Sequence, residues 1–350
     1  MSVPNVFETV EALEAFLSIP TPEVIDALGG LDGDVMILGA GGKMGPTLAL
    51  LARRAVDAGR LDKRVIAVSR FSDDAVTDKL RRAGIETISC DLMDNAALNA
   101  LPDARNIVYM VGMKFGATGQ EARTWAINAY LPGRVVQRFS HSRFVLFSSG
   151  NVYPLTSVFG GGCAESTPPA PIGEYAQSVL GRERVFQHWA EQLGTPGVIF
   201  RLNYAVELRY GVLLDVAQKV WAGAPADLRM GYVNAIWQGD ANAYALRALS
   251  LASSPPQPAA TTRLLNVTGP ETISVRRLAE RFGGLLGREP VFEGEEQPDA
   301  LLNDASQAFK WMGYPRVPLA QAVEWVADWV QRGGPTLDKP TKFQVRDGKF

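Results

Sequence analysis

A glycine-rich turn between a buried strand and a helix constrains this sequence most. The apolar run at 35–38 is followed by Gly39-Ala40-Gly41-Gly42-Lys43-Met44-Gly45, after which a helical pattern begins. Gly39 permits a tight turn, Gly42 lets the backbone approach a pyrophosphate, and Gly45 lets the helix pack close to the strand. Free N–H groups and the dipole at the helix N-terminus favour phosphate. We therefore expect a dinucleotide-binding loop in which Gly39, Gly42, Lys43, Met44 and Gly45 hold the cofactor.

Strand and helix patterns alternate from residue 34 onward. The predicted strands are the apolar stretches at 35–38, 65–69, 85–90, 106–112, 143–149 and 197–202. Their alternation with helices is typical of an α/β fold, a doubly wound parallel sheet covered on both faces. The later pattern is looser and predicts a helix near 211–223, a strand at 264–267, and helices near 274–287, 303–312 and 318–331.

These patterns predict four parts of the chain. A helical extension at 1–33 shows helical spacing and a Thr21-Pro22 helix start, and a dinucleotide-binding domain at 34–205 follows it. A smaller, mostly helical substrate domain is expected at 206–332, with the segment at about 236–270 returning to the first domain. A Pro-rich linker interrupts it at 253–258. The tail at 333–350 has no periodicity, and we expect it to wrap over the surface or fray.

Composition excludes several classes of protein. The net charge of −2, with basic and acidic residues spread along the chain, gives no footprint for nucleic acid or an anionic membrane. No apolar run is long enough to span a bilayer, and the acidic start is unlike a signal peptide, so a cytoplasmic location is expected. Cys90 and Cys163 are too few for a disulfide framework, and the two histidines predict no metal site.

Ser69 and Arg70 follow the second predicted strand, where a carboxylate would bind an adenosine ribose 2′-hydroxyl. Arg70 instead offers charge-assisted hydrogen bonds to a 2′-phosphate, with Lys43 as a second positive charge, so NADP is favoured over NAD. An arginine stacked on adenine is the alternative. Asp91 and Leu92 end the third strand, where the acid could bind the adenine amino group or cap the next turn.

These residues, together with later motifs, resemble the extended short-chain dehydrogenase/reductase family, the NAD-dependent epimerase/dehydratase group. The matching pieces are Gly39, Gly42 and Gly45, then Asp91, then Phe147-Ser148-Ser149-Gly150-Asn151-Val152-Tyr153, then Pro171 and Tyr175. The resemblance runs from about residue 34 to 330 and implies a Rossmann fold with NAD or NADP as cofactor. Gly112-Met113-Lys114 is similar to a Gly-Leu-Lys motif of epimerases in that family, whose lysine helps hold the cofactor.

The resemblance also implies the proton-transfer residues. Carried over, they are Ser149, Tyr175 and Asn128. Tyr175 is also expected to contact the cofactor, and the asparagine supports a water relay in the family. The family lysine four residues after the tyrosine is absent, because Val179 stands there. Bringing a tyrosine pKa from ~10 to ~7 takes roughly 4 kcal/mol of phenolate stabilisation, usually supplied by a nearby cation.

Three explanations for Val179 stay open. Another cation could substitute, such as Lys114, Arg182 or the oxidised nicotinamide itself. Tyr175 could act as a neutral acid or hydrogen-bond donor. Alternatively, the chain could bind cofactor without turnover, as a sensor or scaffold.

The resemblance implies a sugar, sugar derivative or nucleotide sugar as substrate, changed by reduction, epimerisation or dehydration. Ser149 and Asn151, with Asn203, Glu207 and Arg209 from the segment after the sixth strand, are the predicted substrate contacts. A salt-bridged loop would also explain Glu207 and Arg209. A homodimer through about 118–140 and 174–194 is expected by the same resemblance.

Overall fold

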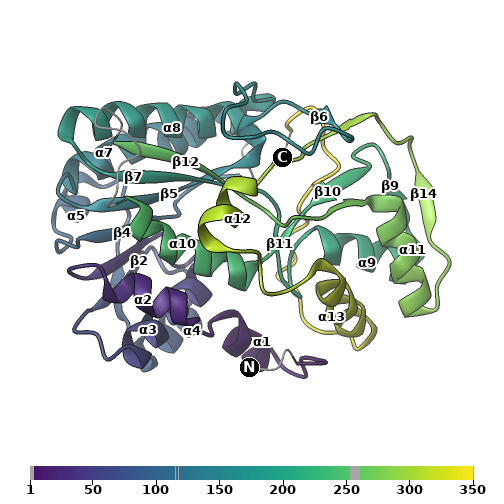
Figure 1. The fold of residues 1–350 in the computed structure, drawn as a ribbon, viewed down its shortest axis with the longest axis horizontal. Helices are drawn as coiled ribbons and strands as arrows, with labels where there is room; N and C mark the ends of the chain where they lie inside the picture. Colours follow the sequence, from purple (N-terminus) through teal and green to yellow (C-terminus); the bar gives the residue numbers. More distant parts are fainter. Residues whose placement is uncertain (1–3, 115, 117, 253–260, 350) are drawn as a thin grey trace.

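A seven-stranded parallel sheet forms the centre of the computed structural model, which describes residues 4–114, 116, 118–252 and 261–349 (Figure 1). The strand order is β12-β7-β5-β4-β1-β2-β3, and every neighbouring pair is parallel. The predicted doubly wound Rossmann fold is confirmed, whereas the Pro-rich linker lies outside the described residues. The strands are β1 (Val35–Leu38), β2 (Val65–Ser69), β3 (Glu86–Ser89), β4 (Asn106–Tyr109), β5 (Arg143–Ser149), β7 (Gly197–Leu202) and β12 (Thr262–Val267).

Helices bury both faces of this sheet, which is why its strands are apolar almost without interruption. In β1, Val35 and Ile37 face one hydrophobic core, and Met36 and Leu38 face the other. Figure 1 shows the two helical layers on opposite sides of the sheet. The first core is covered by α2 (Pro22–Gly29), α3 (Gly45–Ala58), α4 (Asp74–Arg82), α10 (Gln238–Ala252) and α12 (Ser306–Met312), and the second by α5 (Asn95–Asn99), α7 (Leu131–Arg138) and α8 (Gly173–Leu193).

A third hydrophobic core lies beyond the sheet, among helices and short strand pairs. The helices are α1 (Val10–Leu17), α9 (Val212–Ala222), α11 (Val275–Leu286) and α13 (Leu319–Gln331). The short strands, which have no clear sequence pattern, are β6 (Thr156–Ser157), β8 (Ala205–Val206), β9 (Pro225–Asp227), β10 (Tyr232–Asn234), β11 (Ile236–Trp237), β13 (Thr272–Ser274), β14 (Val291–Glu293) and β15 (Asp299–Ala300). The helices near 211–223, 274–287, 303–312 and 318–331 are therefore confirmed within a few residues.

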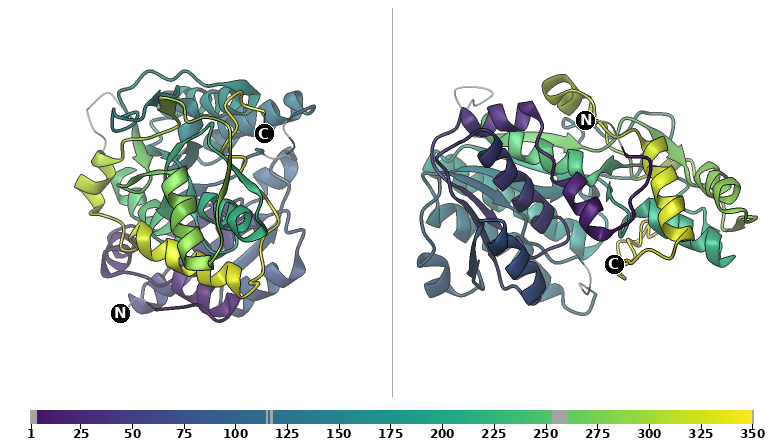
Figure 2. Two further views of the ribbon diagram at one scale, coloured as in Figure 1. Left: turned by 90° about the vertical axis from the view of Figure 1, so that its right-hand side faces the viewer. Right: turned by 90° about the horizontal axis from the view of Figure 1, so that it is seen from below.

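The N-terminal extension contributes to both the first and the third hydrophobic core. Helix α1 contributes Leu13 and Leu17 to the third core, whereas α2 packs against the sheet with α3 and α10. The Thr21 hydroxyl accepts a hydrogen bond from Val24 N, which confirms the predicted helix start. Figure 2 shows α1 and α2 running along one side of the molecule. The exact domain limits stay a prediction, but α10 and β12 do return to the sheet.

The order of the strands places a crevice beside β1. The chain runs from β1 to β2 and β3 on one side, and then crosses to β4 and β5 on the other. Ligands of doubly wound sheets bind at the carboxyl ends of the strands where this order reverses.

Within the described ranges, no helix is long and apolar enough to cross a bilayer.

A buried ion pair ties the sheet to α8. The side chains of Arg201 on β7 and Glu183 on α8 are 1% and 0% exposed, with 2.6 Å between Nη2 and Oε2. Arg201 Nη1 donates to the Tyr153 hydroxyl at 2.6 Å, and that hydroxyl donates to Asn266 on β12 at 2.8 Å. The Ser148 hydroxyl also donates to Glu183. Each charge is thus neutralised inside the protein, and losing one would leave the other uncompensated.

Glu183→Gln is expected to lower the free energy of unfolding by about 3–5 kcal/mol, because it leaves the buried Arg201 charge without its counter-charge. Glu324→Gln is the matched control, since it removes the same charge from an exposed pair with Arg281, where an effect below about 1 kcal/mol is expected. Urea unfolding of the three chains measures the difference. Similar losses in the two variants would show that burial does not set the cost.

Candidate active site

The glycine loop adopts the conformation that its sequence predicts. Gly39 has φ +90°, a left-handed value that disfavours other residues, and its N–H donates to Val68 O at 2.8 Å. A Cβ on Gly45 would lie 2.4 Å from the Ala40 carbonyl oxygen. These two glycines therefore let α3 begin directly behind the end of β1.

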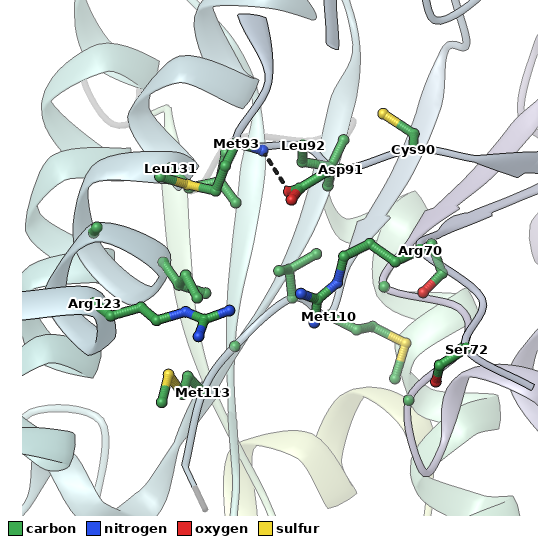
Figure 3. Close-up of a pocket in the computed structure, with 18 of the residues that line it drawn as sticks. Arg70, Ser72, Cys90, Asp91, Leu92, Met93, Met110, Met113, Arg123 and Leu131 are labelled. Atoms are coloured by element: carbon green, nitrogen blue, oxygen red, sulfur yellow. Dashed lines mark hydrogen bonds between the residues drawn. The ribbon is translucent and has the colours of Figure 1, made fainter. Parts of the chain in front are cut away.

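A cavity of about 790 Å³ opens at the carboxyl ends of β1 to β4. Figure 3 shows Arg70 and Arg123 reaching into it from opposite sides, with Asp91 and Leu92 on the wall between them. Asp91 accepts a hydrogen bond from Met93 N at 3.0 Å. The structure thus brings together most predicted cofactor residues, namely Gly39, Gly42, Ser69, Arg70, Asp91, Leu92, Gly112 and Lys114.

Lys43 takes a different direction from the rest of the loop. Its ammonium donates to Ala205 O at 2.8 Å and lies 3.8 Å from the centroid of the Tyr210 ring. Burial lowers the pKa of Lys43 to about 7, while Glu207 favours and Lys114 opposes its charge. The side chain therefore bridges the glycine loop to the segment after β7, and the structure does not bring it to Arg70. Met44 is buried directly before α3.

Tyr175 and Ser149 meet, although they lie on different elements. Ser149 ends β5, and half-buried Tyr175 lies in the first turn of α8. Burial raises the pKa of the Tyr175 phenol, whereas the Arg182 charge and a hydrogen bond with Ser149 act to lower it. Lys114 Nζ lies 5.8 Å from the centroid of the Tyr175 ring. The phenol is therefore a neutral hydrogen-bonding group flanked by two cationic side chains.

Val179, one turn after Tyr175, lies in an apolar cluster. It is buried against Val152, Tyr153 and Cys163. In the family that the sequence resembles, this turn of α8 carries a lysine, whereas here it carries an apolar side chain. Positive charge near the phenol therefore comes from elsewhere than this turn. Among the described residues, Lys114 after β4 and Arg182, further along α8, act on Tyr175.

Asn128 lies on the π-helical turn η1 (Ala126–Tyr130), between α6 (Glu121–Trp125) and α7. Its Oδ1 accepts from Met113 N at 2.8 Å and from Arg182 Nη2 at 2.9 Å. Its Nδ2 donates to Met113 O and to the Ser178 hydroxyl, both at 2.9 Å. All four hydrogen-bonding positions of the amide are occupied. In this conformation the Asn128 side chain fixes the segment that carries Lys114, and its amide has no position left for a relay water.

Burial lowers the pKa of Lys114 to about 8. The Asp215 carboxylate, at the start of α9, favours its charge, and Lys342 opposes it. The Lys114 ammonium also donates to Thr341 O at 3.4 Å. Neither Asp215 nor Thr341 belongs to a sequence motif, and only the packing of α9 and the tail against the strand ends brings them here.

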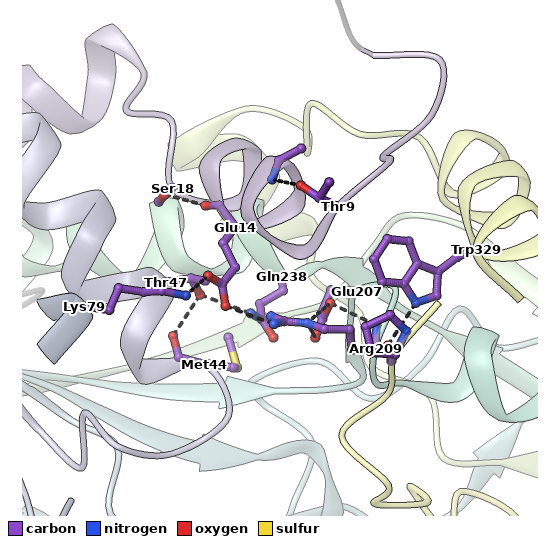
Figure 4. Close-up of polar contacts among 12 residues, drawn as sticks. Thr9, Glu14, Ser18, Met44, Thr47, Lys79, Glu207, Arg209, Gln238 and Trp329 are labelled. Carbon is purple, nitrogen blue, oxygen red and sulfur yellow. Dashed lines mark hydrogen bonds and ion pairs between the residues drawn. The ribbon is translucent and has the colours of Figure 1, made fainter. Parts of the chain in front are cut away.

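The predicted substrate residues are placed unevenly. Asn151, on the turn η2 (Gly150–Val152), donates its N–H to the Ser149 hydroxyl at 3.2 Å. The buried Asn203 amide donates to Asn234 at 2.9 Å. Arg209 pairs with Glu207 at 3.2 Å and with Glu14 on α1 at 2.9 Å (Figure 4). Ser149 and Asn151 are therefore brought together, while Glu207 and Arg209 form the salt-bridged loop that was the alternative interpretation.

Comparison with known proteins identifies relatives of this architecture. Residues 35–206 match the model of the NAD dependent epimerase/dehydratase family. A search of curated proteins finds no match.

Solved structures of similar fold cover most of the chain. A mutant UDP-glucuronic acid 4-epimerase from Bacillus cereus, with a fluorinated UDP-glucuronic acid and NAD, has a TM-score of 0.69 at 15% identity over 85% of this chain and 99% of its own. UDP-glucose 4-epimerase from Thermotoga maritima, with UDP-glucose, has a TM-score of 0.66 at 14% identity, over 86% of this chain and 99% of its own. MoeE5 with UDP-glucose and NAD has a TM-score of 0.67 at 19% identity, over 86% of this chain and 99% of its own. At these identities the likeness establishes the fold.

The lowered pKa of Lys43 predicts how stability depends on pH. Between about 7 and the ordinary value of 10.5, the unfolded chain binds a proton at Lys43 that the folded chain does not. The free energy of unfolding therefore rises with pH through this window. Lys43→Met should show a smaller rise, measured by urea unfolding at several pH values. Lys310→Met, at an exposed position, should keep the full rise, and parallel curves for Lys43→Met and the unsubstituted chain would refute the burial of this charge.

Proposed function

Through residues 35–206 the chain belongs to the NAD dependent epimerase/dehydratase family, and on this premise we propose that it is an NAD(P)-dependent enzyme acting on a sugar-type substrate by hydride transfer. The reaction is reduction, epimerisation or dehydration at a carbinol carbon. The observation that carries this proposal is the pairing of Tyr175 with Ser149 beside Lys114, which also lines the cavity of the glycine loop.

The residues of this cavity suit a dinucleotide. A Cβ on Gly41 would come within 2.7 Å of the Ser69 hydroxyl, so a side chain there would intrude on the cavity wall. The volume lies in the usual range for small-molecule sites. We assign the phosphates to the glycine loop and the start of α3, and the adenosine to the wall made by Arg70, Asp91 and Leu92. The bound nicotinamide would donate or accept the hydride.

Tyr175 is the group proposed to exchange a proton with the substrate. Ser149 holds the phenol and the substrate oxygen in one hydrogen-bonded set, and Asn151 N–H orients the Ser149 hydroxyl. Lys114 and Arg182 supply the positive charge that Val179 does not, because an adjacent cation stabilises a developing phenolate. Asn128 contributes by positioning, since it fixes the Lys114 segment and binds Arg182.

A nucleotide sugar is the substrate class that we favour. The similar structures hold UDP-glucose or a UDP-glucuronic acid derivative. Ser149 and Asn151 remain the proposed substrate contacts here. Asn203, Glu207 and Arg209 would act through the shape of the segment after β7, because their polar groups are bound within the protein.

A cofactor-binding sensor or scaffold is the second candidate. The apolar burial of Val179 favours it, because no lysine stands beside the phenol on α8. The two candidates differ in turnover and not in cofactor affinity.

Pairing of two copies through the helices about 118–140 and 174–194 also stays part of the proposal. Trp125 and Tyr130 on this surface are 38% and 58% exposed, and exposed aromatic residues are enriched at interfaces. A cytoplasmic location stays a prediction from composition.

Tyr175→Phe is expected to lower kcat by about 10²–10⁴-fold, the usual contribution of a positioned acid–base group, with the dissociation constant of the cofactor unchanged. Nicotinamide absorbance and separation of product sugars, with UDP-glucose and UDP-glucuronic acid, provide the measurement. Tyr314→Phe, at a 70% exposed position, is the control. Tight cofactor binding without turnover in the unsubstituted chain, across a broad panel of sugars, would favour the sensor.

Arg70→Ala tests the preference for NADP over NAD. Loss of a charge-assisted hydrogen bond, worth about 1.5–3 kcal/mol, should weaken NADP by roughly tenfold or more and leave NAD nearly unchanged. Arg123→Ala removes the same charge from the opposite wall and should leave the ratio of the two dissociation constants unaltered. An unchanged ratio in Arg70→Ala would mean that this arginine does not read the 2′ position.

A further inference from the structure

The segment after α13 runs past the start of α9 and reaches the start of α8, the helix that carries Tyr175. Leu337 N donates to Arg209 O at 3.0 Å, and Thr341 N donates to the Asp215 carboxylate at 2.9 Å. The Thr341 hydroxyl binds the same carboxylate oxygen. Phe343 is 5% exposed and belongs to the third core. This segment, which was expected to wrap over the surface or fray, is therefore held at defined points.

Its contacts lead directly to the proposed active site. The Thr341 carbonyl accepts from Lys114. Gly348 packs on Gly173, two residues before Tyr175, so closely that a Cβ on Gly173 would lie 2.6 Å from Gly348 O. Between these points Arg346 donates to Arg229 O at 3.0 Å and pairs with Asp299. Residues 339–349 thus run from α9 to the start of α8.

Little space is left beneath these residues. A cavity of about 30 Å³ is lined on one side by Lys114, Asn151 and Tyr153, and on the other by Phe343 and Arg346 of this segment. Small-molecule sites, by contrast, occupy about 300–1,000 Å³. In this state the space beside Asn151, between it and the segment, is too small for a sugar.

We propose that residues 339–349 form a strap that closes the substrate side of the site and must move away before a nucleotide sugar reaches Tyr175. This inference rests on the proposed function. Among the described residues the strap has no helix or strand of its own, and it is held mainly by Thr341, Phe343 and Arg346. Segments with few such anchors open at low cost, as active-site lids do. Its departure would also release Lys114 from the Thr341 carbonyl for contact with substrate.

Loosening the strap in the full chain tests this inference. Thr341→Ala combined with Phe343→Ala removes two anchors, and UDP-glucose is titrated calorimetrically into the NAD-loaded protein. Because closure competes with the ligand, we expect the dissociation constant to fall by roughly tenfold or more, equivalent to about 1.4 kcal/mol. Lys349→Ala, whose side chain is 77% exposed, should bind like the unsubstituted chain. Equal or weaker binding by the loosened chain would overturn the proposal and make the segment a wall of the pocket.

A second readout separates failure of the strap from failure of the proposed function. Met230 is 1% exposed, and its sulfur lies 4.0 Å from Arg346 Nη1, so a Met230→Cys thiol lies beneath the strap. Its reaction with a soluble thiol reagent should accelerate at least tenfold in the loosened chain, and in the milder Thr341→Ala chain the change should have the same sign. Chains without the Met230→Cys substitution give the background reaction rate of Cys90 and Cys163. If no chain binds UDP-glucose but the thiol reacts faster in the loosened chain, the proposed substrate class is wrong and the strap proposal is supported. Equal thiol reaction rates in the loosened and the unloosened chain would overturn the strap proposal.

Discussion

The close approach of Gly45 to the Ala40 backbone is the contact on which the rest of the site depends. A Cβ at position 45 would overlap the Ala40 carbonyl, so any other residue would push α3 away from β1. With glycine, the helix begins directly behind the strand, and its free N–H groups stand at the carboxyl edge of the sheet. The strand order reverses at this edge, and a cavity of about 790 Å³ lies there.

Charge near the phenol has been rearranged compared with the resembled family. The α8 position that would carry a lysine is Val179, sealed in an apolar cluster. The nearby cations stand at other positions, Lys114 after β4 and Arg182 two turns beyond Tyr175 on α8. Distributing the charge in this way ties it to tertiary structure, because Asn128, Asp215 and Thr341 each hold one of these cations in place.

Local sequence patterns predicted much of the fold and only part of the site. The strands, the glycine loop and the Thr21 cap follow from apolar runs and residue types whose effects are local, and Arg70 and Asp91 were found because they end predicted strands. Lys43 was placed beside Arg70, but its long side chain reaches Ala205 instead, a choice made by the packing of a segment more than a hundred residues away. The roles of Asp215, Tyr210 and the strap escaped prediction for the same reason. Nothing in the spacing of their residues shows which strand ends they meet.

The central claim is that a dinucleotide lies across the carboxyl edge of the sheet with its redox ring at Tyr175. A crystal structure of the chain with NADP or NAD tests it most directly. The account predicts the pyrophosphate on the loop from Gly39 to Gly45, the adenosine beside Arg70 and Leu92, and the nicotinamide in contact with Tyr175. A nucleotide bound elsewhere, or a nicotinamide out of contact with that phenol, would contradict it.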